Sequence, residues 1–274
     1  MSDYVKISMS QLLEAGVHFG HHRCRCNPKM QGYLYGVRNN IHIINLEKTV
    51  PMLHDGLDAL KDVAARGGRV LFVGTKRQAR DAIAEAARRC GQYYINHRWL
   101  GGLLTNWKTV SASISKLNQL AEKLKADDTG LTKKELLTLR RQYDKLELAL
   151  GGIREMGSIP NALFIIDVNM ESLAVNEALK LRIPAIAICD SNSDPTKATY
   201  PIPGNDDSSK AIELYCDLAS KAILAGLQDA LISSNSDLGE SESAEVLQLG
   251  VDKGSLVENT SVPEEVDIAS TEAI

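Results

Sequence analysis

The chain has 274 residues, of which 44% are hydrophobic, enough for one or two globular domains with a buried core. No apolar run approaches the roughly 20 residues of a membrane span, and the N-terminal residues lack a signal-peptide pattern, so we expect a cytoplasmic protein with no membrane partner. The formal net charge is −4, and the five cysteines are scattered in a way that is consistent with reduced thiols.

Short apolar runs alternate with longer helical patterns over most of the chain. Strands are predicted at residues 41–46, 69–73, 93–95, 162–167, 183–189 and 200–202, and helices at 50–66, 78–90, 171–181 and 208–231. Runs such as Val70–Val73 and Ala185–Ile188 are apolar on both faces, as in strands covered by helices on both sides. We therefore predict an α/β fold with a Rossmann-like (flavodoxin-like) parallel sheet and helices on both faces.

The hydrophobic period changes between Thr105 and Leu150. Apolar side chains there follow heptad spacing, at positions 110, 114, 117, 121 and 124 and again at 136, 139, 143, 146 and 150. A turn is expected at Asp127–Gly130, and Thr132 with Glu135 forms a capping box for the second helix. We predict an antiparallel coiled-coil hairpin over 108–150, an insertion of the kind that usually serves as a docking arm. The discontinuous α/β domain would then comprise residues 1–107 and 151–233.

The negative charge of the chain belongs to its last segment. Residues 234–274 carry ten acids and one lysine, whereas residues 1–233 have a net charge of +5. The segment has no aromatic residue and is rich in Ser, Glu and Asp, so it cannot bury enough apolar area to offset its chain entropy. We predict an acidic, disordered tail over 234–274.

Two stretches of the body contain no acidic residue. One runs from Ala15 to Leu46, and the other covers 36 residues from Ala86 to Ala121. Both retain lysines and arginines, and both contain polar aromatic side chains. Cations bind phosphates and flat side chains stack on unpaired bases, so the pattern is typical of a surface that binds nucleic acid. Considered alone, each stretch is more often an ordinary solvent-exposed face than a nucleic-acid site. The two tryptophans of the second stretch would then lie in the core.

A glycine turn after the strand at 69–73 raises an enzymatic alternative. The segment Gly74–Lys76 leads into a helix, and the free N–H groups of a helix start bind anions such as a nucleotide phosphate. The signatures G-x-x-x-x-G-K-[ST] and G-x-G-x-x-G are missing, and no acid is placed for a ribose about 20 residues on. A nucleotide-binding Rossmann-type enzyme is therefore the less favoured alternative. No Ser-His-Asp or Cys-His arrangement supports another catalytic site.

Acidic residues beside predicted strand ends are candidate metal ligands. Asp190 follows one strand and Asp206 precedes the last helix, while His18 lies in the N-terminal loop. If these loops meet at the carboxyl edge of the sheet, they can hold a divalent ion such as zinc or magnesium. The aspartates are more commonly used in turns and helix caps. The segment His21–Cys26 fails as a structural zinc motif, because its cysteines are spaced C-x-C and no second pair follows.

A series of short motifs occurs in order along residues 8–230. They are Ala15–His21, Asn27–Met30, His42–Thr49, Leu71–Lys76, Asn96–Gly102, Leu104–Trp107, Leu150–Gly152, Asp190–Pro195 and Ile202–Asp207. Together these motifs closely resemble the bacterial S-two family of small-subunit ribosomal proteins. The acidic tail lies outside the resemblance.

The resemblance implies a structural, non-catalytic constituent of the small ribosomal subunit that acts in translation, with no small-molecule substrate and no required cofactor. Members of that family bind small-subunit ribosomal RNA, neighbour other ribosomal proteins, and help dock the large S-one protein, which captures messenger RNA. The implied RNA contacts are Arg23, Arg25, Lys29, Arg38, Lys76, Arg98, Trp99 and Lys108. A metal is associated with the partner-docking region in some members, which favours His18, Asp190 and Asp206 as its ligands.

Overall fold

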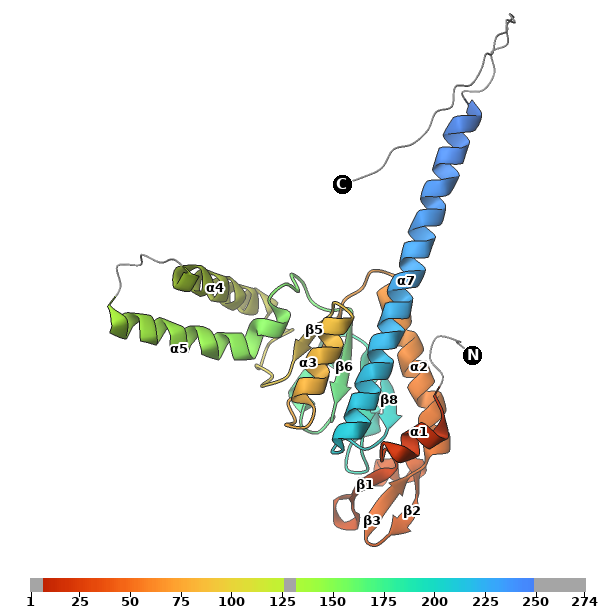
Figure 1. Ribbon diagram of the computed structural model, residues 1–274. Coiled ribbons are helices and arrows are strands. Elements are labelled where there is room, and N and C mark those ends of the chain that lie inside the picture. The colour runs from red at the N-terminus through yellow and green to blue at the C-terminus, as the bar shows by residue number, and fades with distance from the viewer. Residues whose placement is uncertain (1–6, 126–131, 249–274) are drawn as a thin grey trace, which may run out of the picture. The chain divides into compact units, whose positions relative to one another are not determined.

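The computed structural model describes residues 7–125 and 132–248 (Figure 1). The helices are α1 (Met9–Glu14), α2 (Leu46–Ala65), α3 (Arg80–Arg89), α4 (Trp107–Lys125), α5 (Lys133–Leu150), α6 (Ser172–Leu181) and α7 (Ser209–Gln248). The strands are β1 (Phe19–His22), β2 (Leu34–Arg38), β3 (Ile41–Ile44), β4 (Val70–Val73), β5 (Tyr93–Ile95), β6 (Ala162–Ile166), β7 (Ala185–Cys189) and β8 (Tyr200–Pro203). Short 3-10 turns are η1 (Arg23–Arg25), η2 (Pro28–Tyr33), η3 (Gly151–Ile153) and η4 (Pro195–Lys197). None of the helices in this part of the chain is long and apolar enough to cross a membrane.

The main sheet has five parallel strands in the order β5-β4-β6-β7-β8. In order of appearance along the chain this is 2-1-3-4-5, the arrangement of doubly wound, flavodoxin-like sheets. Val73 of β4 pairs with Ile95 on one side and with Ile165 on the other. The predicted α/β class and the parallel sheet are therefore confirmed.

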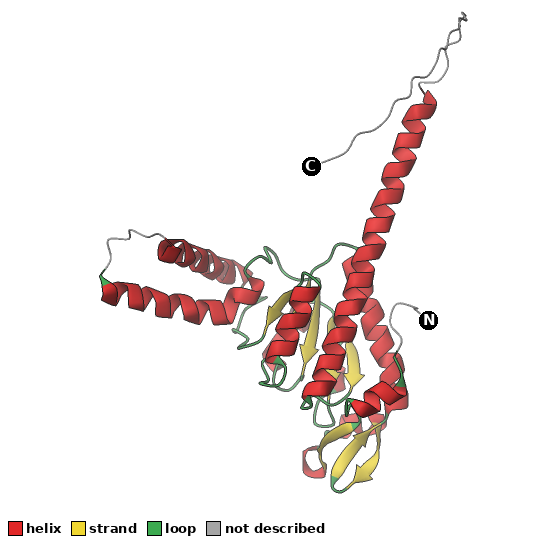
Figure 2. Ribbon diagram, viewed as in Figure 1, coloured by secondary structure: helices red, strands yellow, loops and turns green. Residues whose placement is uncertain are grey.

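Helices cover both faces of this sheet, as Figure 2 shows. Because side chains alternate along a strand, Phe164 of β6 lies in one core cluster and its neighbours Leu163 and Ile165 lie in another. The Phe164 cluster includes buried residues of α2, α3 and α7. The second cluster includes residues of α6 and of the base of α4. This two-sided burial explains why the strands read as continuous apolar runs.

The predicted strand at 41–46 is present as β3 but does not belong to the parallel sheet. Its counterpart β3 pairs antiparallel with β1 and β2 in a separate sheet of order β1-β3-β2. Asn39 and Asn40 join β2 to β3, and both have positive φ angles, of 52° and 62°. Two such residues form the hairpin turn whose twist suits antiparallel strands, and asparagine tolerates this conformation well.

The helices α4 and α5 lie side by side (Figure 1). The predicted heptad positions of α4 are buried at Val110, Ile114 and Leu117. Those of α5 are partly buried at 136, 139, 143 and 146, while the positions between them are mostly exposed. The predicted capping box is confirmed, because Thr132 accepts from the backbone of Glu135 and the Glu135 side chain accepts in return. The predicted turn at Asp127–Gly130 lies outside the described residues.

The last helix, α7, is longer than predicted, since it runs to Gln248. The described residues up to 233 form one compact unit, separate from the residues that follow. The first part of the tail predicted to be disordered over 234–274 therefore belongs to α7. Residues 249–274 lie outside the described part of the chain, and disorder there stays a prediction.

Candidate functional site

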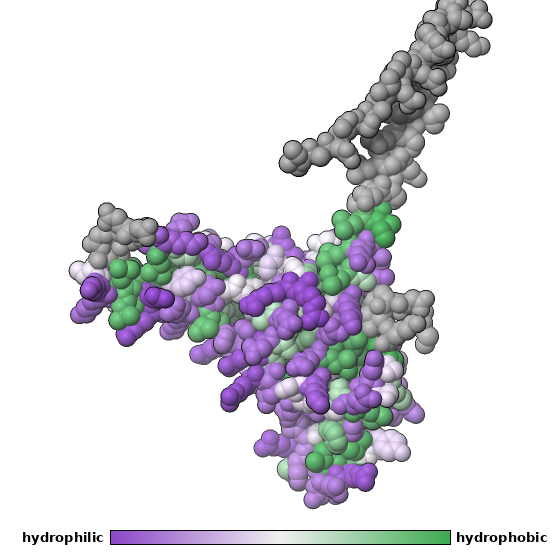
Figure 3. Space-filling view, in the orientation of Figure 1, coloured by the Kyte–Doolittle hydropathy of each residue, from purple (hydrophilic) through white to green (hydrophobic). Residues whose placement is uncertain are grey.

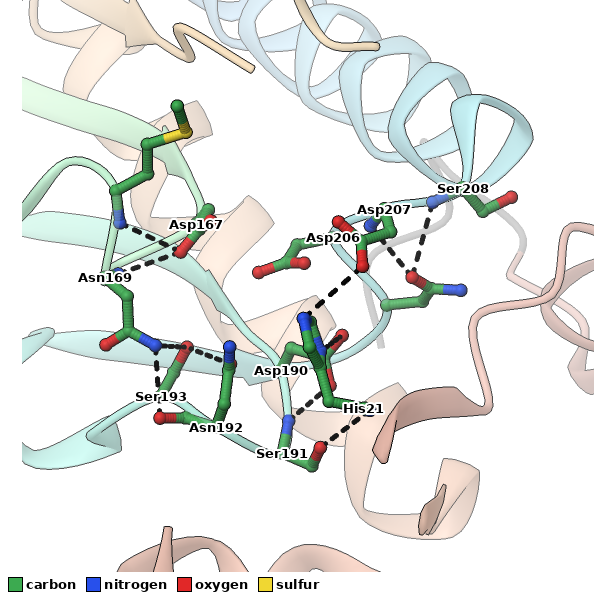
Figure 4. A network of polar contacts seen from close by, with 12 residues as sticks. His21, Asp167, Asn169, Asp190, Ser191, Asn192, Ser193, Asp206, Asp207 and Ser208 are labelled. Atoms are coloured by element: carbon green, nitrogen blue, oxygen red, sulfur yellow. Dashed lines mark hydrogen bonds and ion pairs between the residues drawn. The ribbon is translucent and has the colours of Figure 1, made fainter. Parts of the chain in front are cut away.

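A network of charged side chains lies at the carboxyl edge of the main sheet (Figure 4). Asp167 directly follows β6, Asp190 directly follows β7, and Asp206 comes shortly after β8. Lys76 comes shortly after β4 and completes the set. The carboxyl ends of parallel strands meet at one edge, and this edge is where ligands of such sheets usually bind. The loops that carry Asp190 and Asp206 therefore meet at this edge, which was the condition for a metal site there.

Lys76 is enclosed by carboxylates rather than free for phosphate. Its Nζ lies 2.6 Å from Oδ1 of Asp206, 2.8 Å from Oδ1 of Asp207 and 2.9 Å from Oδ2 of Asp167. Burial acts to lower the pKa of the ammonium, but the Asp206 charge and the hydrogen bonds to the carboxylates outweigh it and raise the pKa. Its side chain is only 13% exposed, so the structure places Lys76 inside the network.

The network holds more negative than positive charge around Asp206. This residue is fully buried, and its Oδ2 has no hydrogen-bond partner among the described residues. Burial and the charges of Asp167 and Asp190 raise the pKa of Asp206 to about 7, despite the opposing effect of Lys76. An unpaired buried carboxylate oxygen of this kind favours a further cation or a proton.

His21 contributes an imidazole to the same network. Its Nδ1 lies 3.0 Å from Oδ2 of Asp190, an ion-pair distance without the in-line geometry of a hydrogen bond. Contact with the Asp190 carboxylate raises the pKa of His21. The nearest ligand atoms of His21, Asp190 and Asp206 all lie within 4.8 Å of one another. One nitrogen and two carboxylate oxygens are a donor set that suits a divalent ion such as zinc.

The structure places His21, rather than the predicted His18, with these aspartates. His18 instead packs against Phe19, with 4.0 Å between the ring centroids. The close approach of β1 to the network depends on Gly20, since a Cβ there would lie 2.9 Å from Oγ of Ser191. The sequence offers two histidines three residues apart, and only the path of β1 selects between them.

The glycine turn after β4 is not an open phosphate site. The backbone N–H of Thr75 donates to Oε1 of Glu171 at 2.8 Å. A carboxylate therefore occupies the position at which a nucleotide phosphate would accept, and Lys76 beside it is already paired. The negative charge of Glu171 would repel a phosphate here. This removes support for the nucleotide-binding alternative.

The remaining predicted RNA contacts divide into exposed and buried residues. Five are exposed cations that form no ion pair within residues 7–125 and 132–248: Arg23, Arg25, Arg38, Arg98 and Lys108. Lys29 is exposed and binds Oδ2 of Asp194 at 2.6 Å. Trp99 is 5% exposed and belongs to the core.

Both acid-free stretches reach the same side of the main sheet. Met30 from the first and Trp99 from the second belong to one core cluster. The exposed cations are held by firm local structure, since Arg38 ends β2 and Lys108 lies in the first turn of α4. Rigid placement of cations is what recognition of a folded nucleic acid by shape requires.

Two important residues escaped prediction. The predicted strand at 162–167 ends with Asp167, whereas this residue directly follows β6 as Asp190 follows β7, so a signal was present in the sequence. Glu177 is a buried carboxylate on α6, and no sequence pattern shows which side of that helix faces the core.

Comparison with known proteins identifies close relatives. A family model described as ribosomal protein S2 matches residues 12–226. The small ribosomal subunit protein uS2 of Granulibacter bethesdensis is 59% identical over 237 residues, which cover 86% of this chain and 92% of that protein. The protein of the same name from Rhodospirillum rubrum is 61% identical over 236 residues, covering 86% of this chain and 90% of the relative. That of Gluconobacter oxydans is 60% identical over 235 residues, covering 86% and 89%.

Proposed function

Because the chain belongs to the ribosomal protein S2 family, we propose that its exposed cations bind the ribosomal RNA of the small subunit. A member of this family is a structural component of the small ribosomal subunit, acts in translation in the cytoplasm, and is not an enzyme. It needs no cofactor.

The observation that supports RNA binding is the set of exposed, unpaired cations in two acid-free stretches. Arg23 and Arg25 lie in η1, and Arg38 ends β2. Arg98 lies in the loop between β5 and α4, and Lys108 lies in the first turn of α4. Neither stretch itself contributes an acidic side chain, although Asp194 and Asp207 approach the first stretch at Lys29 and Arg25. We propose contacts mainly to phosphates rather than base edges. Lys29 can join them only by exchanging Asp194 for a phosphate. Lys76 and Trp99 act indirectly, by holding the fold.

Incorporation into small subunits tests this proposal. Arg38→Glu and Arg98→Glu should reduce co-sedimentation of the full-length protein with small subunits while leaving its unfolding transition almost unchanged. Lys180→Glu is the matched control, because Lys180 is an exposed cation on α6 outside both stretches. Normal incorporation of both arginine variants would contradict the proposal.

We propose that the S-one protein docks on the small sheet β1-β3-β2. This sheet exposes large apolar side chains, including Phe19, Val37 and Tyr35, the last of which is 81% exposed. Figure 3 shows apolar residues gathered there, at the bottom of the view. Exposed aromatic and aliphatic residues of this kind are typical of protein interfaces. Val37→Asp should weaken binding of purified S-one protein to reconstituted subunits, whereas Met170→Asp, at an exposed apolar residue elsewhere, should not.

We also propose that His21, Asp190 and Asp206 can hold one divalent metal ion. The unpaired Oδ2 of Asp206 supports this, and Lys76 competes with it by supplying positive charge. Calorimetry with zinc should show binding that His21→Ala abolishes and His18→Ala preserves. If His18→Ala abolished zinc binding and His21→Ala preserved it, the ligand would be His18 and not His21.

The domain division remains a proposal as well. We propose that residues 108–150 form an inserted coiled-coil arm that contacts RNA or protein neighbours, on an α/β domain of residues 1–107 and 151–233 with an acidic tail over 234–274. The alternating burial along α4 and α5 supports a narrow helical seam. Limited proteolysis should leave residues 7–125 and 132–233 associated after cleavage between α4 and α5.

A further inference from the structure

A small cavity of about 220 Å³ lies where the C-terminal end of α5 meets strand β5 (Figure 1). Its lining includes Arg88 in the last turn of α3, Tyr94 on β5, Asn96 and His97 in the loop that follows, and Glu147 on α5. Cavities that enclose a whole drug-sized ligand have volumes of about 300–1,000 Å³. This cavity is smaller, so it suits one flat group of a larger molecule, such as a nucleobase.

Glu147 gives the cavity an acceptor that lacks a partner. Its Oε2 is buried and has no hydrogen-bond partner among the described residues. A carboxylate oxygen in this situation has lost its water without gaining a donor, which costs free energy. The side chain as a whole is only partly buried, so it can turn this oxygen toward a donor that enters the cavity.

Arg88 gives the same cavity a positioned donor. Its Nη2 donates to the Tyr94 hydroxyl at 2.7 Å, and its Cζ lies 5.2 Å from the centroid of the Tyr94 ring. The acid nearest to it along α3, Glu85, contacts Arg89 instead, at 3.3 Å. Arg88 forms no ion pair with any residue that the structure describes. Its other N–H groups are therefore available to an acceptor.

We propose that this cavity binds the base of one unpaired guanine of the small-subunit ribosomal RNA. Guanine is the only common RNA base with two neighbouring donors on one edge, N1–H and N2–H, and these match the two oxygens of the Glu147 carboxylate. On its other edge the O6 and N7 atoms accept, and arginine is their most common partner. In adenine, cytosine and uracil an acceptor lies beside each donor and would face the carboxylate. Unpaired bases are commonly recognised through these edges.

The inference rests on the proposed function, because the RNA must be bound before it can place a base in the cavity. Arg98, one of the proposed phosphate contacts, directly follows His97 of the cavity lining. The cavity therefore adjoins a proposed phosphate contact.

Fluorescence anisotropy with the full-length protein and short single-stranded RNAs tests the inference. The RNAs are plain oligouridine and oligouridine with one central guanine, adenine or cytosine. The guanine RNA should bind roughly tenfold more tightly than the other three. Glu147→Gln should lower its affinity to that of plain oligouridine, because the amide group presents a donor to a guanine donor. Asp144→Asn, at an exposed carboxylate on the same helix, is the matched control and should keep the preference.

Changes in the RNA test the same contacts without altering the protein. Inosine lacks the N2 amino group of guanine and should lose most of the preference. The base 7-deazaguanine lacks the N7 acceptor and should bind several-fold less tightly than guanine to the native protein. It should bind about as tightly as guanine to Arg88→Gln, since the partner of N7 is then missing.

The outcomes separate this inference from the proposed function. Equal binding of all four RNAs would overturn the guanine site and leave RNA binding intact. So would failure of the guanine RNA to bind when small-subunit ribosomal RNA does. Absence of binding to ribosomal RNA would contradict the proposed function itself. Tight binding of guanosine monophosphate without a preference among the RNAs would assign the cavity to a free nucleotide and overturn the RNA source.

Discussion

The indole Nε1 of Trp99 donates a hydrogen bond of 3.0 Å to Oε1 of Glu177. The same carboxylate accepts from the backbone N–H groups of Gly102, Leu104 and Thr105 at 2.8, 2.9 and 3.1 Å, and from the Thr105 hydroxyl at 3.2 Å. One side chain of α6 therefore fixes the whole loop that leads from β5 into α4. This arrangement gives Trp99 a structural role at the base of the helix pair.

Removing the Glu177 carboxylate should destabilise the protein strongly. Glu177→Ala leaves several buried donors without an acceptor, and each such loss costs on the order of 1–3 kcal/mol, so we expect a total of roughly 2–4 kcal/mol after relaxation. Trp99→Phe removes one hydrogen bond and part of a buried ring and should cost about half as much. Urea unfolding monitored by circular dichroism measures both. Glu155→Gln, at an exposed carboxylate, is the control and should change the free energy of unfolding by less than about 0.5 kcal/mol.

The same carboxylate should make stability depend on pH. Burial acts to raise the pKa of Glu177, but the hydrogen bonds from Trp99 and the loop backbone outweigh it and hold the pKa below its ordinary value of 4.5. A group whose pKa is depressed in the folded state stabilises the protein above its unfolded pKa, and this contribution is lost as the pH falls through the folded pKa. The difference in unfolding free energy between native protein and Glu177→Gln should therefore be constant above about pH 5 and shrink at lower pH. A difference that does not change with pH would show that the pKa of Glu177 is the same in the folded and unfolded states.

The parts of this architecture that the sequence revealed are those with a local signature. Strands β4 and β7 are apolar on both faces because helices cover both sides, and that pattern is visible in any single strand. The strand β1 has only four residues, with no regular alternation of buried and exposed positions, so it carries no such signature. Asn39 and Asn40 did carry a hairpin signal, which would have identified the small sheet.

The candidate site, too, could be predicted only where its residues have a local signature in the sequence. Asp190 and Asp206 were found because residues after parallel strands meet at one edge whatever the rest of the fold does. The choice of His21 over His18 depends on how closely β1 approaches Ser191, and the enclosure of Lys76 depends on three loops that are distant in sequence. Contacts of this kind depend on tertiary packing, which no local pattern records.

The network at the sheet edge should behave as a coupled unit. Lys76→Met removes the ammonium group and leaves the buried carboxylates around it without their counter-charge. Breaking a buried ion pair in this way lowers the free energy of unfolding by roughly 3–5 kcal/mol. Asp206→Asn introduced together with it should recover part of that loss, because the most deeply buried of the charges is then removed. A double-mutant cycle of unfolding free energies measures the coupling. Purely additive effects would show that Lys76 does not act through Asp206.

RNA binding by the free, full-length protein should depend steeply on salt. Each phosphate contact releases counterions, so replacing one contacting cation by a neutral residue lowers the slope of log Kd against log salt concentration by about 1. We expect this change for Arg38→Gln and for Arg98→Gln. Filter binding to small-subunit ribosomal RNA at several potassium chloride concentrations provides the measurement. Lys180→Gln should leave the slope as it is, and an unchanged slope in the arginine variants would remove them from the interface.

Two adjacent glycines at the end of α5 should differ sharply in their tolerance of a methyl group. A Cβ on Gly152 would lie 2.1 Å from the backbone oxygen of Tyr94 and within 3 Å of its ring, so strand β5 and the turn η3 must separate to admit it. A Cβ on Gly151 would meet only the flexible end of Glu147, at 2.8 Å, and that side chain can move away. Gly152→Ala should therefore destabilise the protein by roughly 1–3 kcal/mol, the usual cost of overpacking, while Gly151→Ala should be nearly neutral. Thermal unfolding of the two variants side by side provides the comparison, and equal stability would mean that η3 does not pack against β5 as closely as the structure shows.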